Sequence, residues 1–462
     1  MLIVVGGIGS QPALGAWLTA VPGFVKSTDT HGVGLKELLD SFRQFFALER
    51  DVLVLSVAML AFSLSFQMTS RYIPEYLRVL GAGAGVIGLY GSVSNLISAV
   101  YPYPGGALSD RIGSRIALTV FAVLSTLGFG VWFLAPELSS LTPRGVVIPA
   151  WVLIFVGLFL SQSWKSFGLG ATFAIVRQSV APGQLATGFA STETFRRIGF
   201  LIGPLLASVL LATTAGFVSG FQRVLLLAAV LAGIALIAQH LLYDASNDSL
   251  GKQFEGLSQV ITDLRTLPTE LRPLLVGDIF IRFANGMVYV FFVIVVTDFL
   301  DIGLTAFGRT LEPAAFFGVL LGLEMVVALL SMIPVSKLAE RVGLKPVIAL
   351  GYFVYAIFPI LLINAPANAL VVGALFAFSG LRFAGLPAHK AMIVGPAERK
   401  SGGRVTGSYY LVRNTIVIPS AALGGWLYSL NPTLAFELAT VVGLLGTGYY
   451  LAFGEEFAPY AS

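Results

Sequence analysis

Long apolar runs constrain this chain more than any other feature of its sequence. A helix rises 1.5 Å per residue, so crossing the ~30 Å hydrocarbon core of a bilayer takes about 20 apolar residues. Such runs occur at 52–73, 84–103, 116–135, 148–174, 185–213, 222–243, 273–297, 313–335, 346–364, 367–394, 405–430 and 432–453. The chain is therefore predicted to be an all-α membrane protein with twelve transmembrane helices.

Composition excludes most other classes of protein. Only 11% of the 462 residues are charged and 56% are hydrophobic, whereas soluble domains carry about 25% charged residues. Soluble enzymes, nucleic-acid-binding modules and disordered proteins are excluded on this ground. The chain has no cysteine, and His31, His240 and His389 have no metal-ligand spacing. We therefore expect no enzyme activity, cofactor, metal or nucleic-acid partner.

Basic residues predict the orientation in the membrane. Lys and Arg concentrate in the N-terminal segment and the even-numbered loops, while Arg78, Arg144, Arg223 and Arg309 are the ones assigned to odd-numbered loops. Because basic loops stay in the cytoplasm, both termini are predicted to be cytoplasmic, in a multi-pass protein of the plasma or inner membrane.

The expected organisation has five parts. Residues 1–33 are expected to be a poorly ordered segment rather than a signal peptide, since their apolar stretch has no basic residue before it and is too broken by Gly and Pro to span a membrane. Residues 34–243 form a six-helix bundle preceded by an interfacial helix over 35–48. Residues 244–272 form a cytoplasmic linker with an amphipathic helix over 254–267. Residues 273–453 form a second six-helix bundle, and 454–462 a tail.

The two halves repeat one another. Leu108 to Arg115 (LSDRIGSR) aligns with Leu338 to Lys345 (LAERVGLK), and Lys165 aligns with Arg382. The alignment offset changes only at loops, as a duplicated six-helix unit requires.

The loop after the second span resembles the signature of a known family. The residues from Gly106 to Arg115 (GALSDRIGSR) closely resemble the signature loop of the major facilitator superfamily, and a degenerate copy lies between spans 8 and 9. The resemblance implies two pseudo-symmetric six-helix bundles with a central path lined by helices 1, 4, 7 and 10. We interpret the loop and its copy as a conformational latch rather than a simple positive-inside anchor, since an anchor does not explain Asp110. The latch residues are Gly106, Asp110, Arg111, Gly113, Arg115, Glu340, Arg341 and Gly343.

A second resemblance lies in the fifth span. Gly199, Gly203 and Pro204 match the glycines and proline of a motif found in proton-coupled antiporters of the same superfamily, although Ala207 and Ser208 replace its last two glycines. The alternative is an ordinary packing face of small residues.

Polar residues inside the spans mark the candidate substrate cavity, since charge in a bilayer must pair or face water. Along the four path-lining helices these residues are Gln67, Arg71, Lys165, Arg282 and Arg382, with His389 beside them. Lys165 and Arg382 occupy duplicated positions, so they could neutralise an anionic substrate between the bundles. The alternative is that protein carboxylates neutralise each of them.

Three carboxylates inside the spans are the candidate coupling residues. Glu324 has no basic residue at i±3 or i±4, so it must pair with another helix, face water or be protonated. Glu193 has Arg196 and Arg197 at i+3 and i+4, and Asp278 has Arg282 at i+4. We therefore interpret Glu193 and Asp278 as structural pairs and Glu324 as the proton carrier.

The sequence thus predicts a secondary active transporter that works by alternating access. Proton-coupled efflux of a small organic compound is the favoured function. An organic-anion carrier by symport or exchange is one alternative, and a non-transporting membrane receptor or scaffold on the same fold is another. The expected partners are the lipid bilayer, a small-molecule substrate and protons, with the protein a monomer.

Overall fold

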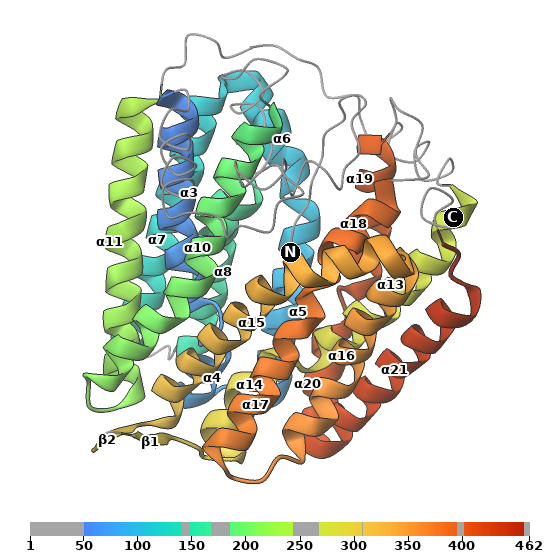
Figure 1. The fold of residues 1–462 in the computed structure, drawn as a ribbon. Coiled ribbons are helices and arrows are strands. Elements are labelled where there is room, and N and C mark those ends of the chain that lie inside the picture. The colour runs from blue at the N-terminus through green and yellow to red at the C-terminus, as the bar shows by residue number, and fades with distance from the viewer. Residues whose placement is uncertain are drawn as a thin grey trace, which may run out of the picture.

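The computed structural model describes residues 50–140, 148–167, 185–243, 268–306, 308–394 and 402–456 (Figure 1). Almost all of these residues are helical. The expected interfacial helices at 35–48 and 254–267, together with residues 1–33, lie outside the described residues.

Helices of the first half account for the first six predicted spans. Span 1 is built from two helices separated by a short turn, and span 2 from two consecutive helices. The elements are α3 (Arg50–Thr69), α4 (Ile73–Val79), α5 (Ala84–Val100), α6 (Pro102–Ile112), α7 (Ser114–Ser140), α8 (Ala150–Ser166), α10 (Leu185–Ala212) and α11 (Phe217–Leu242).

Helices of the second half account for the other six. Spans 7, 10 and 11 are interrupted, as Gly and Pro within them allow. The elements are η3 (Thr269–Leu271), α13 (Arg272–Val288), η4 (Tyr289–Phe291), α14 (Phe292–Ile294), η5 (Val295–Phe299), α15 (Pro313–Val342), α16 (Leu344–Ile363), α17 (Ala369–Gly380), η6 (Leu381–Phe383), α18 (Leu386–Val394), α19 (Gly402–Val417), α20 (Ser420–Leu430) and α21 (Pro432–Phe453).

The prediction of twelve spans is confirmed, but three details of it were wrong. The first helical span continues through α4 to Val79 rather than ending at 73. The signature segment is not an open loop: Gly106 to Ile112 belong to α6, and the chain turns only at Gly113. A short antiparallel hairpin, β1 (Leu304–Ala306) with β2 (Arg309–Leu311), stands between spans 7 and 8 and was not predicted.

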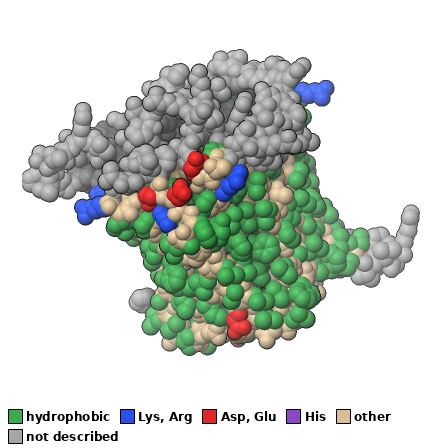
Figure 2. All heavy atoms as spheres, turned by 90° about the vertical axis from the view of Figure 1, so that its right-hand side faces the viewer, with side chains coloured by type: hydrophobic (Ala, Val, Ile, Leu, Met, Phe, Trp, Pro, Cys, Tyr) green, Lys and Arg blue, Asp and Glu red, His purple; other side chains and the backbone are tan. Residues whose placement is uncertain are grey.

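The flank of the molecule suits a lipid environment. Among the described residues, nine helices are long and apolar enough to cross a membrane, and α5 is a shorter apolar helix. Large apolar side chains such as Leu330 and Leu370 are 72% and 80% exposed. Apolar side chains cover most of the described part of the face in Figure 2, with charged side chains gathered mainly towards one end of that part. Such a surface is stable only when hydrocarbon covers it.

The two halves contact each other near the end that carries β1 and β2, which we call the hairpin end (bottom of Figure 1). There α5 packs on α20 and α10 packs on α15. Gly88 touches Gly425, and a Cβ built on Gly88 would lie 2.7 Å from the Gly425 Cα. Likewise Gly318 of α15 packs against the Pro204 carbonyl and Ser208 of α10. Small residues let these backbones approach closely.

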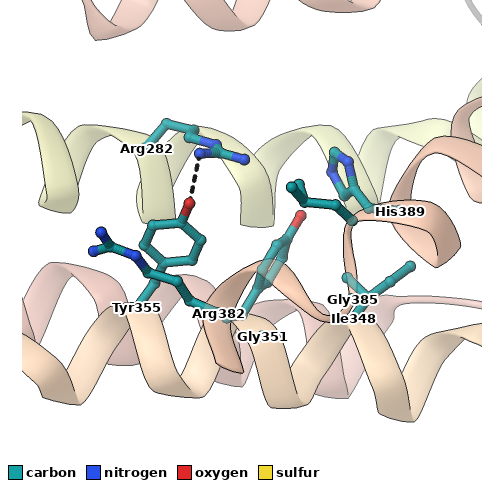
Figure 3. Close-up of a pocket in the computed structure, with 9 residues that line it drawn as sticks. Arg282, Ile348, Gly351, Tyr355, Arg382, Gly385 and His389 are labelled. Carbon is teal, nitrogen blue, oxygen red and sulfur yellow. Dashed lines mark hydrogen bonds between the residues drawn. The ribbon is translucent and has the colours of Figure 1, made fainter. Parts of the chain in front are cut away.

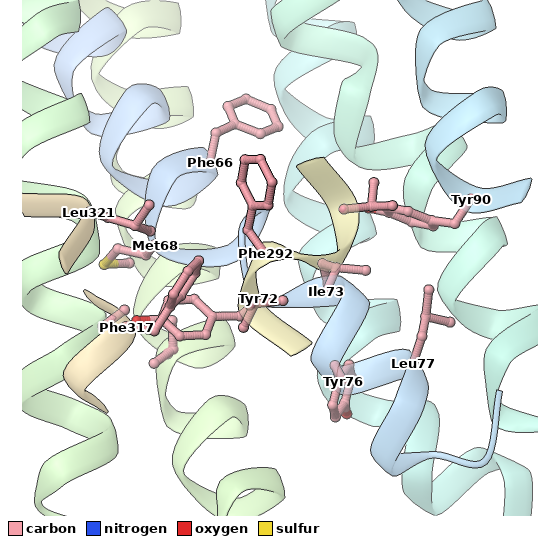
Figure 4. Close-up of a cluster of buried hydrophobic side chains, with 14 of the residues drawn as sticks. Phe66, Met68, Tyr72, Ile73, Tyr76, Leu77, Tyr90, Phe292, Phe317 and Leu321 are labelled. Atoms are coloured by element: carbon pink, nitrogen blue, oxygen red, sulfur yellow. The ribbon is translucent and has the colours of Figure 1, made fainter. Parts of the chain in front are cut away.

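Aromatic packing fills the space between the halves at the same end. Phe66, Tyr72 and Tyr76 of the first half share one buried cluster with Phe292 and Phe317 of the second (Figure 4). The Tyr72 and Phe317 rings meet edge to face, with centroids 5.6 Å apart. Aromatic contact and close helix packing therefore hold the hairpin end closed.

Candidate functional site

A fully buried carboxylate organises the second half. Asp278 of α13 accepts hydrogen bonds from Arg282 Nε (3.2 Å), Arg413 Nη1 (3.0 Å) and the Tyr409 hydroxyl (3.2 Å). His389 Nε2 of α18 lies 3.3 Å from the same carboxylate. The expected pairing of Asp278 with Arg282 at i+4 is thus present, and two further cationic or titratable side chains from α18 and α19 join it.

Glu324 pairs across helices. Arg382 of η6 places Nη2 2.7 Å from Glu324 Oε1, and the Ser379 hydroxyl donates to the same oxygen at 2.5 Å. Glu324 and Arg382 are 4% and 5% exposed. The sequence left three outcomes for Glu324: pairing with another helix, facing water or being protonated. In the structure it pairs with a residue of another helix.

Tyr355 of α16 connects the two ion clusters. Arg282 Nη1 donates to its hydroxyl at 3.1 Å, and both Arg282 and Arg382 place their guanidinium carbons about 5 Å from its ring, at 5.0 and 5.1 Å. A cavity of about 20 Å³ opens between them, lined in part by Tyr352, Arg382 and His389 (Figure 3). That volume is enough for about one water molecule. Arg382 Nε and the Tyr352 hydroxyl, both buried, have no hydrogen-bond partner within the described residues.

Two cations of the first half face a different environment. Lys165, near the end of α8, has an exposed side chain whose Nζ lies 5.9 Å from the centroid of the Phe66 ring. Arg71, between α3 and α4, is half-buried, with its guanidinium carbon 5.8 Å from the centroid of the Tyr289 ring of the second half. Lys165 and Arg382, equivalent in sequence, are therefore not equivalent in surroundings.

Gln67 and the helix 5 segment meet at a packing contact. A Cβ on Gly203 would lie 2.8 Å from the Gln67 Cβ, and Gly199 packs equally closely on Ser63 of α3. The next residue, Pro204, turns its carbonyl towards Gly318 of α15. This segment of α10 therefore contacts α3 in its own half and α15 in the other half.

The signature segment and its copy each end at a glycine whose backbone has a positive φ, a conformation that favours glycine over other residues. Gly113 and Gly343 have φ of 88° and 92°, which other residues adopt at a cost. Arg115 donates through Nε to the His240 carbonyl at 2.9 Å. Beyond Gly343, the Glu456 carboxylate accepts from the backbone N–H groups of Leu344 and Lys345, capping α16.

The remaining predicted residues are placed only in part. Arg111 and Arg341 are exposed at the same end as Gly113. Asp110, Glu340 and Glu193 lie within α6, α15 and α10, but their side chains are outside the described residues, as is the burial of Gly106.

A salt bridge between the halves at the hairpin end was missed by sequence reasoning. Glu75 binds Arg78 through both oxygens, at 2.7 and 2.9 Å, and Arg78 Nη1 reaches Asp298 at 2.8 Å. Glu75 and Arg78 lie one turn apart on α4, whereas Asp298 lies in the π-helical turn η5. The i,i+3 spacing of Glu75 and Arg78 could have signalled the local pair, but nothing in the sequence identifies Asp298 as the third member.

Tyr409, Tyr355 and Ser379 were also missed. A lone hydroxyl in an apolar span is a weak signal, because most such groups bond their own backbone. No group of three His, Cys, Asp or Glu side chains that could hold a metal ion occurs within the described ranges.

Comparisons with known proteins agree with this architecture. The family described as Major Facilitator Superfamily matches residues 53–311. An uncharacterized MFS-type transporter of Methanocaldococcus jannaschii is 22% identical over 88% of this chain and 95% of its own length. Another, from Mycobacterium tuberculosis, is 29% identical over 42% of each chain.

Solved structures share the fold. The crystal structure of a nucleoside transporter superposes with a TM-score of 0.66 at 14% identity, covering 89% of this chain and 100% of that one. A POT family transporter in complex with 5-aminolevulinic acid gives 0.65 at 15% identity, covering 90% and 100%. At these identities the likeness concerns the fold alone.

Proposed function

The chain belongs to the major facilitator superfamily, and from this premise we propose that it is a secondary active transporter that moves a small organic molecule by alternating access, driven by protons. It is a multi-pass membrane transporter and not an enzyme. The proposal adds the mechanism, the coupling ion and the direction of transport, for which export is the favoured choice.

One observation carries the proposed mechanism: the halves are joined by tight glycine contacts at the hairpin end. Packed interfaces of this kind are bistable rather than gradually deformable. Opening the hairpin end would separate Gly88 from Gly425 and break the bridge from Arg78 to Asp298, while the opposite end closes. In this proposal the signature segments, which end at Gly113 and Gly343, latch that opposite end.

Proton coupling is supported by the buried carboxylates of the second half. Glu324 shares a hydrogen-bonded pair with Arg382, so adding a proton to Glu324 would release the guanidinium for another anion. His389, in contact with Asp278, offers a second titratable group in the same region. Export is supported by the helix 5 segment, whose Gly203 and Pro204 pack where the proton-antiporter resemblance expects close helix contact.

Orientation and assembly complete the proposal. The end opposite the hairpin end, where Arg111 and Arg341 are exposed, would face the cytoplasm. The protein would then lie in the plasma or inner membrane. The protein would act as a monomer, since the path lies between two halves of one chain.

Distance measurements between spin labels test alternating access directly. The chain contains no cysteine, so cysteine pairs can be introduced without background. One labelled pair, T213C with A367C, reports the distance at the hairpin end, and a second pair, I116C with V342C, reports the distance at the opposite end. When the pH is changed between 5 and 8, we expect the first distance to increase while the second decreases. Fixed distances at both ends, in lipid and over that whole range, would contradict alternating access.

Flux separates a transporter from a receptor on the same fold. Proteoliposomes with an imposed pH gradient should accumulate or lose substrate, and the flux should stop when an ionophore collapses the gradient. A protein that changes conformation but carries no flux of any compound that binds it would be a receptor or scaffold.

A further inference from the structure

Two cations of the first half, Lys165 and Arg71, have no counter-charge among the residues that the structure describes. Neither Lys165 nor Arg71 forms an ion pair or a hydrogen bond within the described part of the chain. Among the described residues, Arg71 is a positive group close enough to act on Lys165. Like charges held near one another repel, and a bound anion would relieve that repulsion. The first half therefore presents a positive site that described side chains leave uncompensated.

The second half is different because three of its cations each contact a carboxylate. Arg382 is paired with Glu324, while Arg282 and Arg413 share Asp278. Of the aligned pair Lys165 and Arg382, Lys165 is therefore the one with no carboxylate partner in the described ranges, which leaves it available to a ligand. The sequence repeat suggests equal roles for Lys165 and Arg382, but their different partners make the two positions unequal.

The surroundings of the two free cations point to an organic ligand. Phe66 of the first half lies beside Lys165, and Tyr289 of the second half lies beside Arg71. A bound anion with an apolar body could contact these rings while its charge meets the ammonium and guanidinium groups. An inorganic anion would use the charges but leave the ring faces uncovered.

Helix geometry connects this site to the second half. Arg282 lies seven residues before Tyr289 in the same helical run, which places the two on one face about 10 Å apart. Arg282 is 26% exposed and lines the cavity beside Arg382 and Tyr355. A ligand seated at Arg71 would therefore lie close to the ion clusters that the proposed coupling uses.

We propose that Lys165 and Arg71 form the binding site for the anionic group of an organic substrate, whose apolar body packs against Phe66 and Tyr289. This rests on the proposed transport function and assigns its substrate class: a small organic anion carrying a carboxylate or phosphate group. Binding joins the first half, through Lys165, to the second half, through Tyr289, so the ligand contacts both halves that alternating access moves.

Binding to the purified full-length protein in lipid nanodiscs tests the assignment. The probes are a library of small aromatic and aliphatic carboxylates and phosphate monoesters, each accompanied by its neutral amide or alcohol. Thermal stabilisation identifies binders, and calorimetric titration measures their affinity. We expect the anionic members to stabilise the protein and their neutral counterparts to fail.

Three variants locate the site. K165M and R71Q should each weaken binding of the best anion at least tenfold, because each removes one of the two charges. R223Q removes an exposed cation elsewhere in the same half and should leave the affinity unchanged. The melting temperatures of the three unliganded variants confirm that each is folded.

Four results would overturn the assignment. They are stabilisation by neutral or cationic compounds only, stabilisation by no anionic member, unchanged affinity in both K165M and R71Q, or equal loss in R223Q. The spin-label distances use no added organic compound, so a protein that alternates but ignores anions would refute this inference while leaving the proposed mechanism intact.

Discussion

A single methyl group at Gly88 should shift the protein away from the state that is closed at the hairpin end. In the structure a Cβ at this position of α5 would overlap the Ala421 carbonyl oxygen and lie 2.7 Å from the Gly425 Cα. Both neighbours are backbone atoms of α20, which cannot rotate away as a flexible side chain could. The substitution G88A therefore forces α5 and α20 apart.

The magnitude follows from the cost of overpacking. Inserting a methyl group into a packed contact costs about 1–3 kcal/mol, and here the cost falls only on the state closed at the hairpin end. The ratio of open to closed protein should rise about 5- to 150-fold. Alanine also favours helix over glycine by up to ~1 kcal/mol, but this gain is present in both states and cancels in the ratio.

Gly85 supplies the matched control. It lies three residues earlier on α5, and a Cβ built there meets nothing within 4 Å. Spin labels at T213C and A367C should report a longer distance in G88A and an unchanged distribution in G85A. If G88A leaves the distribution of distances unchanged, or if G85A shifts it equally, the glycine contact does not hold this end closed.

Three further substitutions test the charged residues. D110N should lower flux strongly while leaving membrane insertion intact, since the proposed latch needs the carboxylate; wild-type flux would remove the latch assignment. E324Q should abolish transport driven by a pH gradient but spare counterflow exchange, with S379A as a control that keeps the pair with Arg382; full gradient-driven flux in E324Q would show that Glu324 is not the proton carrier. D278N should lower the free energy of unfolding by about 3–5 kcal/mol, because it leaves buried cations unpaired. D298N is the control: its ion pair with Arg78 has side chains that are 53% and 33% exposed, so it should lower the free energy of unfolding by under ~1 kcal/mol. Equal melting temperatures for these two variants would contradict the buried-pair argument.

Local features of this protein could be predicted because they depend on short sequence separations. A transmembrane helix satisfies its backbone hydrogen bonds within one run of residues, so the apolar runs alone predict where the twelve spans lie. The pair of Asp278 and Arg282 follows from i+4 spacing on one helix. The turns at Gly113 and Gly343 follow from the residue type that tolerates a positive φ.

Contacts between helices could not be predicted, since they depend on how each helix is rotated about its axis and packed. The sequence shows that Glu324 lacks a basic neighbour on its own helix, yet only the packing of α15 against η6 brings it to Arg382, 58 residues later. In the same way, only tertiary structure brings Arg413 to Asp278 and Gly88 to Gly425. The duplication even suggests equal roles for Lys165 and Arg382, but their neighbours on other helices differ, and those neighbours decide which cation is compensated.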